Sequence, residues 1–270
     1  MENANKQRKI KCELYHDSFQ NYKRYNIPKA QLVIADIPYN LGNNAYASNP
    51  SWYIGGDNKN GESKKANSQF FPSDKNFNLV EYMHFCQKLL IKEPKEKGKA
   101  PAMIIFCAFQ QMHMLIEIGK RYGFKNAYPL FFIKKTSGQA LKANQKILGA
   151  TEYAVVLYRD KLPKFNNAWQ QEETGKKMIL NWFEFKRDSV KEVPKIHPTQ
   201  KPVNLLEKLI KTFTDEGDVV IDPVAGSGTT LLATKKTKRN SFGFEVLRDI
   251  YKKSKDELLS IEFEEQQKLF

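Results

Sequence analysis

The sequence has few of the residues that build metal sites and disulfide frameworks. Its three cysteines (Cys12, Cys86 and Cys107) lie far apart, and its four histidines show no paired spacing. These patterns predict no metal site and no disulfides, and they favour a reducing compartment such as the cytoplasm. No run approaches the roughly 18–20 apolar residues of a membrane span. The polar, basic start of the chain is unlike a secretory signal.

What the sequence does have is enough apolar material for a large core and an excess of positive charge. Of its 270 residues, 41% are hydrophobic and 12% are aromatic, which predicts one α/β domain spanning residues 1–270. The formal net charge of +14 indicates a polyanionic partner. Nucleic acid is the first expectation, and an anionic membrane surface is the second.

Short apolar runs alternate with segments of helical periodicity along most of the chain. This alternation predicts a doubly wound, mainly parallel sheet. The last twenty residues have the pattern of an amphipathic helix. The expected strands cover residues 10–15, 31–35, 103–108, 127–133, 153–158, 218–221 and 241–244, and the expected helices cover 79–91, 112–122, 202–214 and a segment from about 229.

Two segments interrupt this alternation. Residues 40–77 are rich in Asn, Gly, Ser and Lys, and a connection of this length inside a domain is usually functional. Residues 159–195 are basic and irregular in pattern and contain Trp169 and Trp182. Both segments are therefore expected to be irregular insertions, and 40–77 to be functional or mobile.

The strand expected at 31–35 runs into Asp36-Ile37-Pro38-Tyr39. A carboxylate and a neighbouring main-chain carbonyl can accept both hydrogens of an exocyclic base amine, which frees the nitrogen lone pair to attack. Pro38 restricts Ile37 to an extended conformation, so the Ile37 carbonyl has a fixed direction. Tyr39 offers a ring on which an extruded base can stack. The same four residues also fit an ordinary turn, in which Asp and Pro are common.

A second motif, Asp222 to Thr230, lies between an expected strand and an expected helix. Gly226 and Gly228 allow a ligand to approach the backbone closely, and the free N–H groups of the helix start favour a carboxylate such as that of a methionine moiety. The next strand ends at Glu245, where an acid can hold ribose hydroxyls. A third motif, His197-Pro198-Thr199-Gln200-Lys201-Pro202, precedes the helix at 202–214.

Together these motifs resemble the β class of DNA amino-methyltransferases, in which D-P-P-Y comes first, H-P-T-Q-K-P next and D-P-F-x-G-S-G-T last. The resemblance spans roughly residues 10–255. It implies a seven-stranded, Rossmann-like methyltransferase sheet, S-adenosylmethionine as cofactor and double-stranded DNA as substrate. This sequence departs from the family pattern at His16, Ile37 and Val224, where the family has Gly, Pro and Phe.

The resemblance also implies the roles of individual residues. Catalysis is expected at Asp36, Pro38 and Tyr39, with Asp17 matching a turn that contacts the cofactor adenine. The residues expected to bind the cofactor are Asp17, Asp36, Thr199, Gln200, Lys201, Asp222, Pro223, Ala225, Gly226, Ser227, Gly228, Thr229, Thr230 and Glu245.

The two insertions acquire expected roles from the same resemblance. Segment 40–77 is expected to close over a flipped base, and its lysines (Lys59, Lys64 and Lys65) to meet phosphates. Segment 159–195 occupies the place of the target-recognition segment. Its candidate DNA contacts are Lys161, Lys164, Lys176, Lys177, Lys186 and Arg187.

Partners and alternatives follow by analogy. The family often forms homodimers, and a cognate restriction endonuclease is a further possible partner. Asp at position 36 favours adenine N6 as the target. Two alternatives stay open: an enzyme acting on cytosine N4 or on RNA, and a relative that binds nucleic acid without methylating it.

Overall fold

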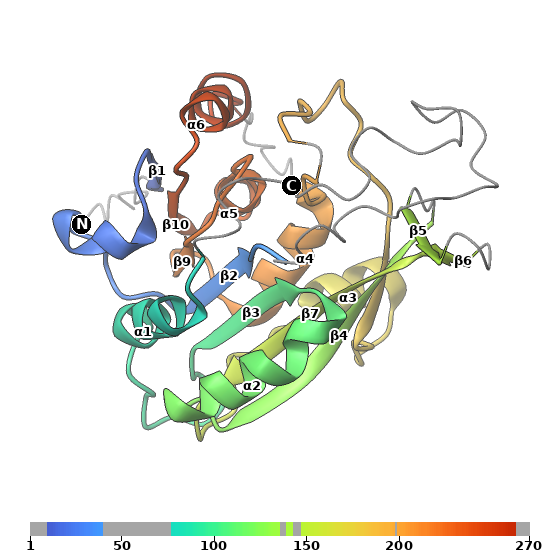
Figure 1. Ribbon diagram of the computed structural model, residues 1–270. Coiled ribbons are helices and arrows are strands. Elements are labelled where there is room, and N and C mark those ends of the chain that lie inside the picture. The colour runs from blue at the N-terminus through green and yellow to red at the C-terminus, as the bar shows by residue number, and fades with distance from the viewer. Residues whose placement is uncertain (1–9, 40–76, 136–138, 143–146, 198, 263–270) are drawn as a thin grey trace, which may run out of the picture.

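A central eight-stranded sheet organises the computed structural model, which describes residues 10–39, 77–135, 139–142, 147–197 and 199–262 (Figure 1). The strands are β1 (Cys12–Tyr15), β2 (Leu32–Asp36), β3 (Ala102–Cys107), β4 (Asn126–Lys134), β5 (Gln139–Lys142), β6 (Ile147–Gly149), β7 (Thr151–Tyr158), β8 (Trp182–Phe185), β9 (Val219–Asp222) and β10 (Asn240–Phe244). The helices are η1 (Phe19–Arg24), α1 (Leu79–Leu89), η4 (Phe109–Gln111), α2 (Met112–Arg121), α3 (Ala168–Thr174), α4 (Val203–Phe213), α5 (Thr229–Lys236), α6 (Arg248–Lys253) and the π-helical η6 (Ser254–Leu258).

The strand order is β1-β10-β9-β2-β3-β7-β4-β8. Strand β7 is antiparallel to both of its neighbours, β3 and β4, and every other neighbouring pair in this sheet is parallel. The predicted doubly wound, mainly parallel fold is thereby confirmed. The described sheet has one strand more than the expected seven, because β8 joins its edge beside β4.

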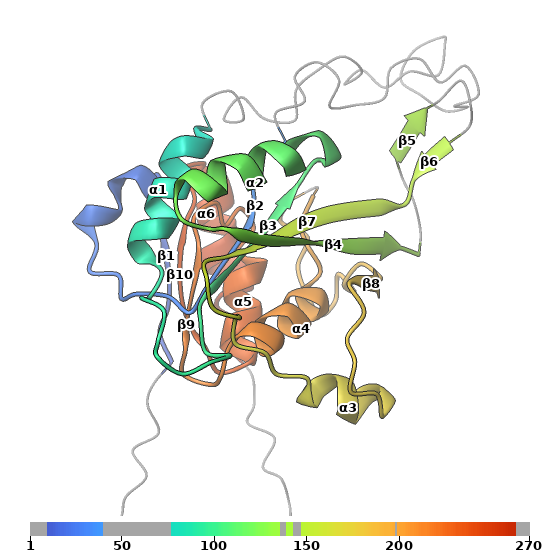
Figure 2. The same ribbon diagram turned by 90° about the horizontal axis from the view of Figure 1, so that it is seen from below.

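Both faces of the sheet are covered, which explains why its inner strands are continuous apolar runs. In β2, Leu32 and Ile34 face one core, to which α4 and α5 contribute. Val33 and Ala35 face the opposite core, to which α1 and α2 contribute. Figure 2 shows the two helix layers on either side of the strands. All four of these side chains are fully buried, so the register of β2 is fixed on both faces.

The chain reverses its direction of travel across the sheet between β9 and β2. Strand β10 follows β9 toward one edge, whereas β3 follows β2 toward the other. Four parallel strands, β1, β10, β9 and β2, end along the same border. In open α/β sheets, ligands bind outside the carboxyl ends of the strands at such a reversal. Asp36 and Asp222 are the last residues of the two strands that flank it.

Segment 159–195 is more regular than its sequence pattern indicates. It contains the short helix α3 and the edge strand β8. Trp169 of α3 is buried, and its indole N–H donates a 2.9 Å hydrogen bond to Thr212 Oγ1 of α4. The prediction of irregular structure was therefore wrong here, because a buried tryptophan anchors a helix too short to show clear periodicity.

The structure describes only part of two further segments discussed from the sequence, the C-terminal helix and segment 40–77. At the C-terminal end, α6 and η6 carry the chain to Leu258, and residues 263–270 lie outside the described part. Most of segment 40–77 also lies outside the described residues. Within the described ranges, every helix is too short or too polar to cross a membrane.

Candidate active site

Asp36 and Lys201 form the centre of the site. Lys201 Nζ lies 2.5 Å from Asp36 Oδ2 and donates a hydrogen bond to it. The other carboxylate oxygen, Oδ1, is buried and has no hydrogen-bond partner in the structure. An unsatisfied buried carboxylate oxygen is costly, so its presence marks a position where a donor from a ligand fits.

Two further charged residues extend this pair into a chain across the sheet. Glu152, at the start of β7, places Oε2 3.2 Å from Lys201 Nζ. Its other oxygen, Oε1, lies 2.5 Å from Lys134 Nζ at the end of β4. We name Asp36, Lys201, Glu152 and Lys134 the charge chain. It contains two positive and two negative groups, so it is neutral as a whole when all four are ionised.

The charge chain shifts the pKa values of its members. Burial acts to lower the pKa of Lys201, but the neighbouring carboxylates raise it well above its usual value. Burial raises the pKa of Asp36, while Lys201 opposes that shift through charge and hydrogen bonding. Burial also acts to raise the pKa of Glu152, but Lys201 and Lys134 together lower it. Lys201 therefore stays positively charged well into the alkaline range, and it favours the ionised form of Asp36.

Aromatic rings border the ion pair. Lys201 Nζ lies 5.9 Å from the ring centroid of Tyr39 and 5.1 Å from that of Phe106. Cation–π attraction at such distances adds to the hold on the ammonium group. The sequence motif residues Asp36 and Tyr39 thus meet Lys201, which comes from the third motif, at one place.

The glycine-rich turn lies beside this cluster at the end of β9. Gly226 and Gly228 have φ values of +52° and +80°, which favour glycine. The Ala225 N–H donates to the Phe244 carbonyl over 2.8 Å, which ties the turn to the end of β10. Helix α5 then begins at Thr229. Both glycines therefore meet a conformational requirement of the turn, and the approach of a ligand to its backbone stays a prediction.

Two acidic side chains at this border are buried and have no cationic neighbour among the ion pairs of the described residues. Burial raises the pKa of Asp222 to about 7 and that of Glu245 to about 7. The Val224 N–H donates to Asp222 over 3.1 Å, and the Leu247 N–H donates to Glu245 over 2.6 Å. Two buried acids without ion-pair partners at the ends of β9 and β10 suit a ligand that carries positive charge and hydroxyl groups.

Three residues predicted to contact the cofactor are engaged within the protein. Asp17 accepts hydrogen bonds from Ser18, Asn21 and Tyr25, and it thereby fixes the turn after β1. Gln200 accepts from the Ile196 N–H and donates to the Pro194 carbonyl. The Thr199 hydroxyl lies 2.9 Å from His197 Nδ1. These residues shape the loops around the site.

Glu152 and Lys134 are missing from the sequence prediction. The one available signal is that Glu152 directly precedes an apolar run, Tyr153 to Tyr158, expected as a strand. A charged residue at the edge of a buried strand suggests a partner, but the sequence does not identify Lys201 as that partner.

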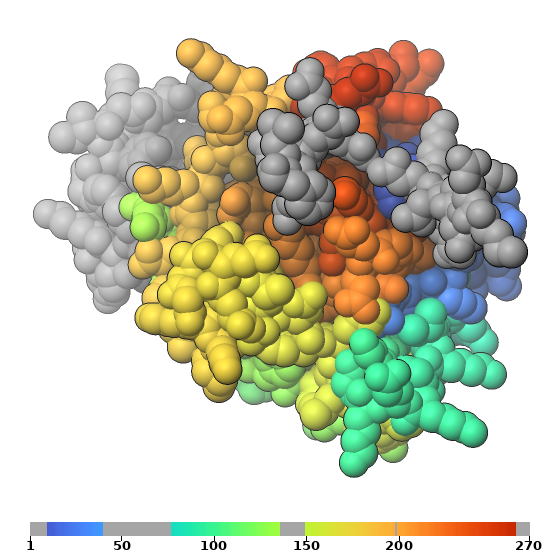
Figure 3. Space-filling model, turned by 180° about the vertical axis from the view of Figure 1, so that it is seen from behind, coloured from blue at the N-terminus to red at the C-terminus, as the bar shows by residue number. Residues whose placement is uncertain are grey.

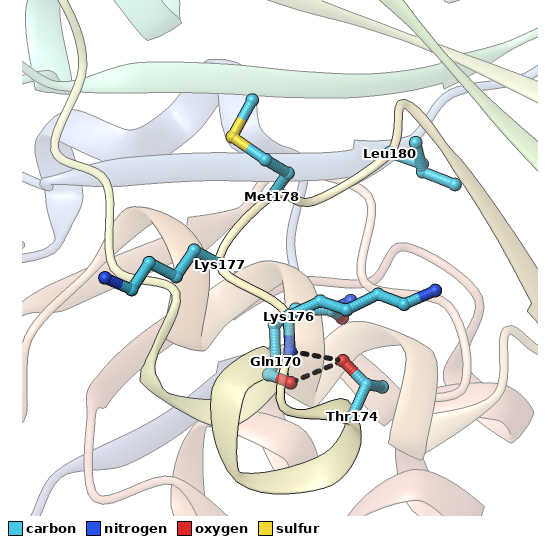
Figure 4. Close-up of a pocket in the computed structure, with 6 residues that line it drawn as sticks. All are labelled: Gln170, Thr174, Lys176, Lys177, Met178 and Leu180. Atoms are coloured by element: carbon cyan, nitrogen blue, oxygen red, sulfur yellow. Dashed lines mark hydrogen bonds between the residues drawn. The ribbon is translucent and has the colours of Figure 1, made fainter.

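A pocket of about 410 Å³ lies away from these residues, next to α3 (Figure 4). Its lining includes Lys176, Lys177, Met178 and Leu180, of which the last two are exposed apolar side chains. Gln170 and Thr174 also line this pocket, and the Thr174 hydroxyl donates a hydrogen bond to the Gln170 carbonyl. The pocket is lined by none of the residues of the charge chain, so it is a surface feature of segment 159–195.

The six candidate DNA contacts of segment 159–195 divide into two groups. Lys164 is buried and lies 2.8 Å from Asp215 and 2.6 Å from Asp218, and Lys161 donates to the Pro94 carbonyl. These two lysines therefore stabilise the fold. The side chains left exposed are Lys176, Lys177, Lys186 and Arg187. Figure 3 shows this part of the chain, in yellow, standing on the surface beside α4 in orange.

Known structures share this fold. A complex of M1.HpyAVI with SAM is 23% identical, with 90% of this chain and 97% of that chain covered and a TM-score of 0.63. The PvuII DNA methyltransferase, described as cytosine-N4-specific, is 15% identical, with 90% and 84% covered and a TM-score of 0.63.

Curated relatives match over shorter segments. The type II methyltransferase M.HindIII of Haemophilus influenzae is 51% identical over 55 residues, 20% of this chain and 18% of that protein. M2.DpnII of Streptococcus pneumoniae is 38% identical over 78 residues, 29% of each chain. The matched segments therefore span less than a third of these relatives.

The family comparison covers far more of the chain. A model described as DNA methylase, for the N6 and N4 methyltransferases, matches residues 30–256. This range includes the Asp36 motif, the His197 to Pro202 motif and the glycine-rich turn. The chain therefore belongs to the DNA methylase family.

Proposed function

We propose that this protein transfers a methyl group from S-adenosylmethionine to the N6 amine of an adenine that is flipped out of double-stranded DNA. The observation that carries the proposal is the buried, unpaired Oδ1 of Asp36, with Oδ2 held by Lys201. Family membership supports DNA methylation as the reaction class. Methylation of cytosine N4 is the alternative outcome.

The residues of the chain prepare the amine for attack. Asp36 Oδ1 accepts one amino hydrogen, and the Ile37 carbonyl accepts the other. Two acceptors on opposite hydrogens draw the nitrogen toward a tetrahedral geometry, so its lone pair is less delocalised into the ring. Lys201 holds Oδ2, which prevents the carboxylate from rotating Oδ1 away. Preorganised acceptors of this kind need no rearrangement during the reaction.

Base flipping requires compensation for the lost stacking in the duplex. Flipping costs a few kcal/mol, and stacking on an aromatic ring returns roughly 1–3 kcal/mol. Tyr39 lies beside Asp36 and supplies that ring. A hydrogen bond to the charged carboxylate contributes about 1.5–3 kcal/mol more. These terms together are large enough to hold an extruded base.

The cofactor belongs at the neighbouring strand ends. When bound, S-adenosylmethionine supplies the methyl group, which is activated by the positive charge of its sulfonium. Glu245 would hold the ribose hydroxyls, and the turn from Asp222 to Thr230 would hold the methionine end. The unpaired acids Asp222 and Glu245 fit a ligand with an ammonium group, a sulfonium and a diol.

DNA is expected to meet the exposed basic residues of segment 159–195 and residues of segment 40–77. Lys176 and Lys177 lie next to the exposed apolar side chains of the pocket beside α3. Because phosphate contacts release counterions, affinity for DNA should fall steeply as salt rises. The homodimer and the partner nuclease stay predictions from the family resemblance.

The test is methyl transfer from labelled S-adenosylmethionine to unmethylated DNA, followed by nucleoside analysis. Labelled N6-methyladenine supports the proposal, and labelled N4-methylcytosine selects the alternative. Asp36→Ala should lose about 10²-fold or more in rate, because a transition-state hydrogen-bond partner is removed. Asp160→Ala is the matched control, since Asp160 forms an exposed ion pair with Lys125. DNA binding without transfer by the wild-type chain would contradict the proposal.

A further inference from the structure

The hydrogen bonding between β2 and β3 changes at the point where the catalytic motif begins. The strands are parallel, with Asp36 opposite Phe106. The Ile37 N–H continues the ladder by donating to the Phe106 carbonyl over 3.3 Å. In a parallel ladder, the next bond would run from the Ala108 N–H to the Ile37 carbonyl.

Gln111 takes the place of that bond. The Ala108 N–H donates to Gln111 Oε1 over 2.9 Å, and Gln111 Nε2 donates to the Pro38 carbonyl over 3.0 Å. The side chain is buried, with 7% of its surface exposed. Its oxygen must face the N–H group and its nitrogen the carbonyl, so the amide has one orientation. Gln111 therefore bridges the ends of the two strands.

The Gln111 bridge changes the hydrogen bonding of the Ile37 carbonyl. Since the Ala108 N–H is engaged by Gln111, the Ile37 carbonyl receives no backbone hydrogen bond from the residues that the structure describes. This carbonyl follows directly after Asp36, whose Oδ1 is also unpaired. Among the described residues, two neighbouring acceptors at the end of this strand, Asp36 Oδ1 and the Ile37 carbonyl, thus have no hydrogen-bond donor.

We infer that Gln111 is a positioning residue that ends the β2–β3 ladder one bond early and so reserves the Ile37 carbonyl for the substrate amine. This inference rests on the proposed function. Gln111 acts through Ile37 and Pro38 and does not itself touch the amine. Its donor group fixes Pro38, and its acceptor group occupies the competing donor of Ala108.

The test compares single-turnover methyl transfer by the wild type, Gln111→Ala and Gln110→Ala. Gln110 is the adjacent, exposed glutamine, which makes it a matched control. Gln111→Ala should lower the rate constant by about 10-fold or more, by analogy with the loss of a transition-state acceptor. The KM values for DNA and cofactor should change by less than about 2-fold, because the groups that bind them remain. Gln110→Ala should keep the wild-type rate.

Gln111→Glu separates positioning from a general loss of folding. A carboxylate at this position still accepts from Ala108 but cannot donate to Pro38, whereas the protonated acid can do both. The rate of this variant relative to wild type should therefore rise as the pH is lowered. Wild-type rates in Gln111→Ala, or a pH-independent ratio in Gln111→Glu, would overturn the inference. Absence of transfer by the wild type would instead overturn the proposed function, and this inference with it.

Discussion

Lys201 Nζ and Asp36 Oδ2 lie 2.5 Å apart although the two residues are separated by 165 positions in the sequence. The contact joins the motif at the end of β2 to the motif that precedes α4. The contact also makes the two oxygens of the Asp36 carboxylate different from one another. One oxygen accepts a hydrogen bond from Lys201, and the other is buried without a hydrogen-bond partner.

The first prediction concerns loss of that lysine. Lys201→Met should lower the rate of methyl transfer by about 10²-fold, because Asp36 Oδ1 is no longer held in place. It should also destabilise the fold by about 3–5 kcal/mol, the usual result of removing one partner of a buried ion pair. Denaturant unfolding measures the second effect.

Two variants serve as controls for this prediction. Lys120→Met removes an exposed lysine paired with Glu117 and should change stability by less than about 0.5 kcal/mol. The double variant Asp36→Asn with Lys201→Met should recover stability without recovering activity. A Lys201→Met variant with wild-type activity would show that Asp36 does not depend on the pair.

The second prediction concerns Glu152. Glu152→Gln keeps the size of the side chain but removes one of the carboxylates that raise the pKa of Lys201. That pKa should fall, so the loss of activity on the alkaline side of the rate profile should begin at lower pH than in the wild type. Glu184→Gln is the control, since Glu184 pairs with Lys135 in an exposed position. Identical alkaline limbs in the wild type and Glu152→Gln would exclude this role.

The third prediction concerns pH and stability without cofactor. Burial raises the pKa of Glu245 from 4.5 to about 7, so the folded state holds a proton that the unfolded state releases in this window. The stabilisation from that proton is complete below pH 4.5 and is lost as the pH rises to about 7. Within this window the free energy of unfolding falls by up to about 1.4 kcal/mol per pH unit.

Glu245→Gln removes this contribution, so its free energy of unfolding should decline less than that of the wild type between pH 4.5 and 7. Thermal unfolding at several pH values measures the difference. Glu172→Gln, which alters an exposed carboxylate, should follow the wild-type curve. Parallel curves for Glu245→Gln and the wild type would mean that Glu245 titrates alike in both states.

The fourth prediction concerns the support of the glycine-rich turn. A Cβ at Gly243 would lie 2.8 Å from Leu231 Cδ1 and 3.0 Å from Ala225 Cβ. Gly243→Ala should therefore displace the turn, cost about 1–3 kcal/mol of stability and weaken S-adenosylmethionine binding. Gly119→Ala is the control. Gly119 lies on α2, away from the turn, and a Cβ there would meet Leu157 Cδ1 of β7 at 3.1 Å. Calorimetric titration with cofactor should detect weaker binding in Gly243→Ala alone.

The order of most elements outside segment 159–195 and the residue types at the strand ends could be predicted from the sequence alone. Apolar runs such as 31–35 and helical periodicity such as 202–214 are local patterns, because side-chain direction repeats every 2 residues in strands and every 3.6 in helices. Acids at 36, 222 and 245 follow predicted strands directly, and glycines at 226 and 228 lie in the turn after one of them. The motifs and their order then indicated the family, which the comparison with known proteins confirmed.

Only the tertiary structure decided which side chains meet. The pairing of Lys201 with Asp36 and Glu152 depends on sheet register and on the approach of the segment before α4, and neither has a local signature. The same holds for Gln111, whose role arises from the ladder between two strands. The hydrogen bonds of Asp17 and Gln200 within the protein were likewise not predictable from the sequence, because they depend on how the loops fold. Motifs determine which groups are present at a border of the sheet, and packing determines which of them remain free.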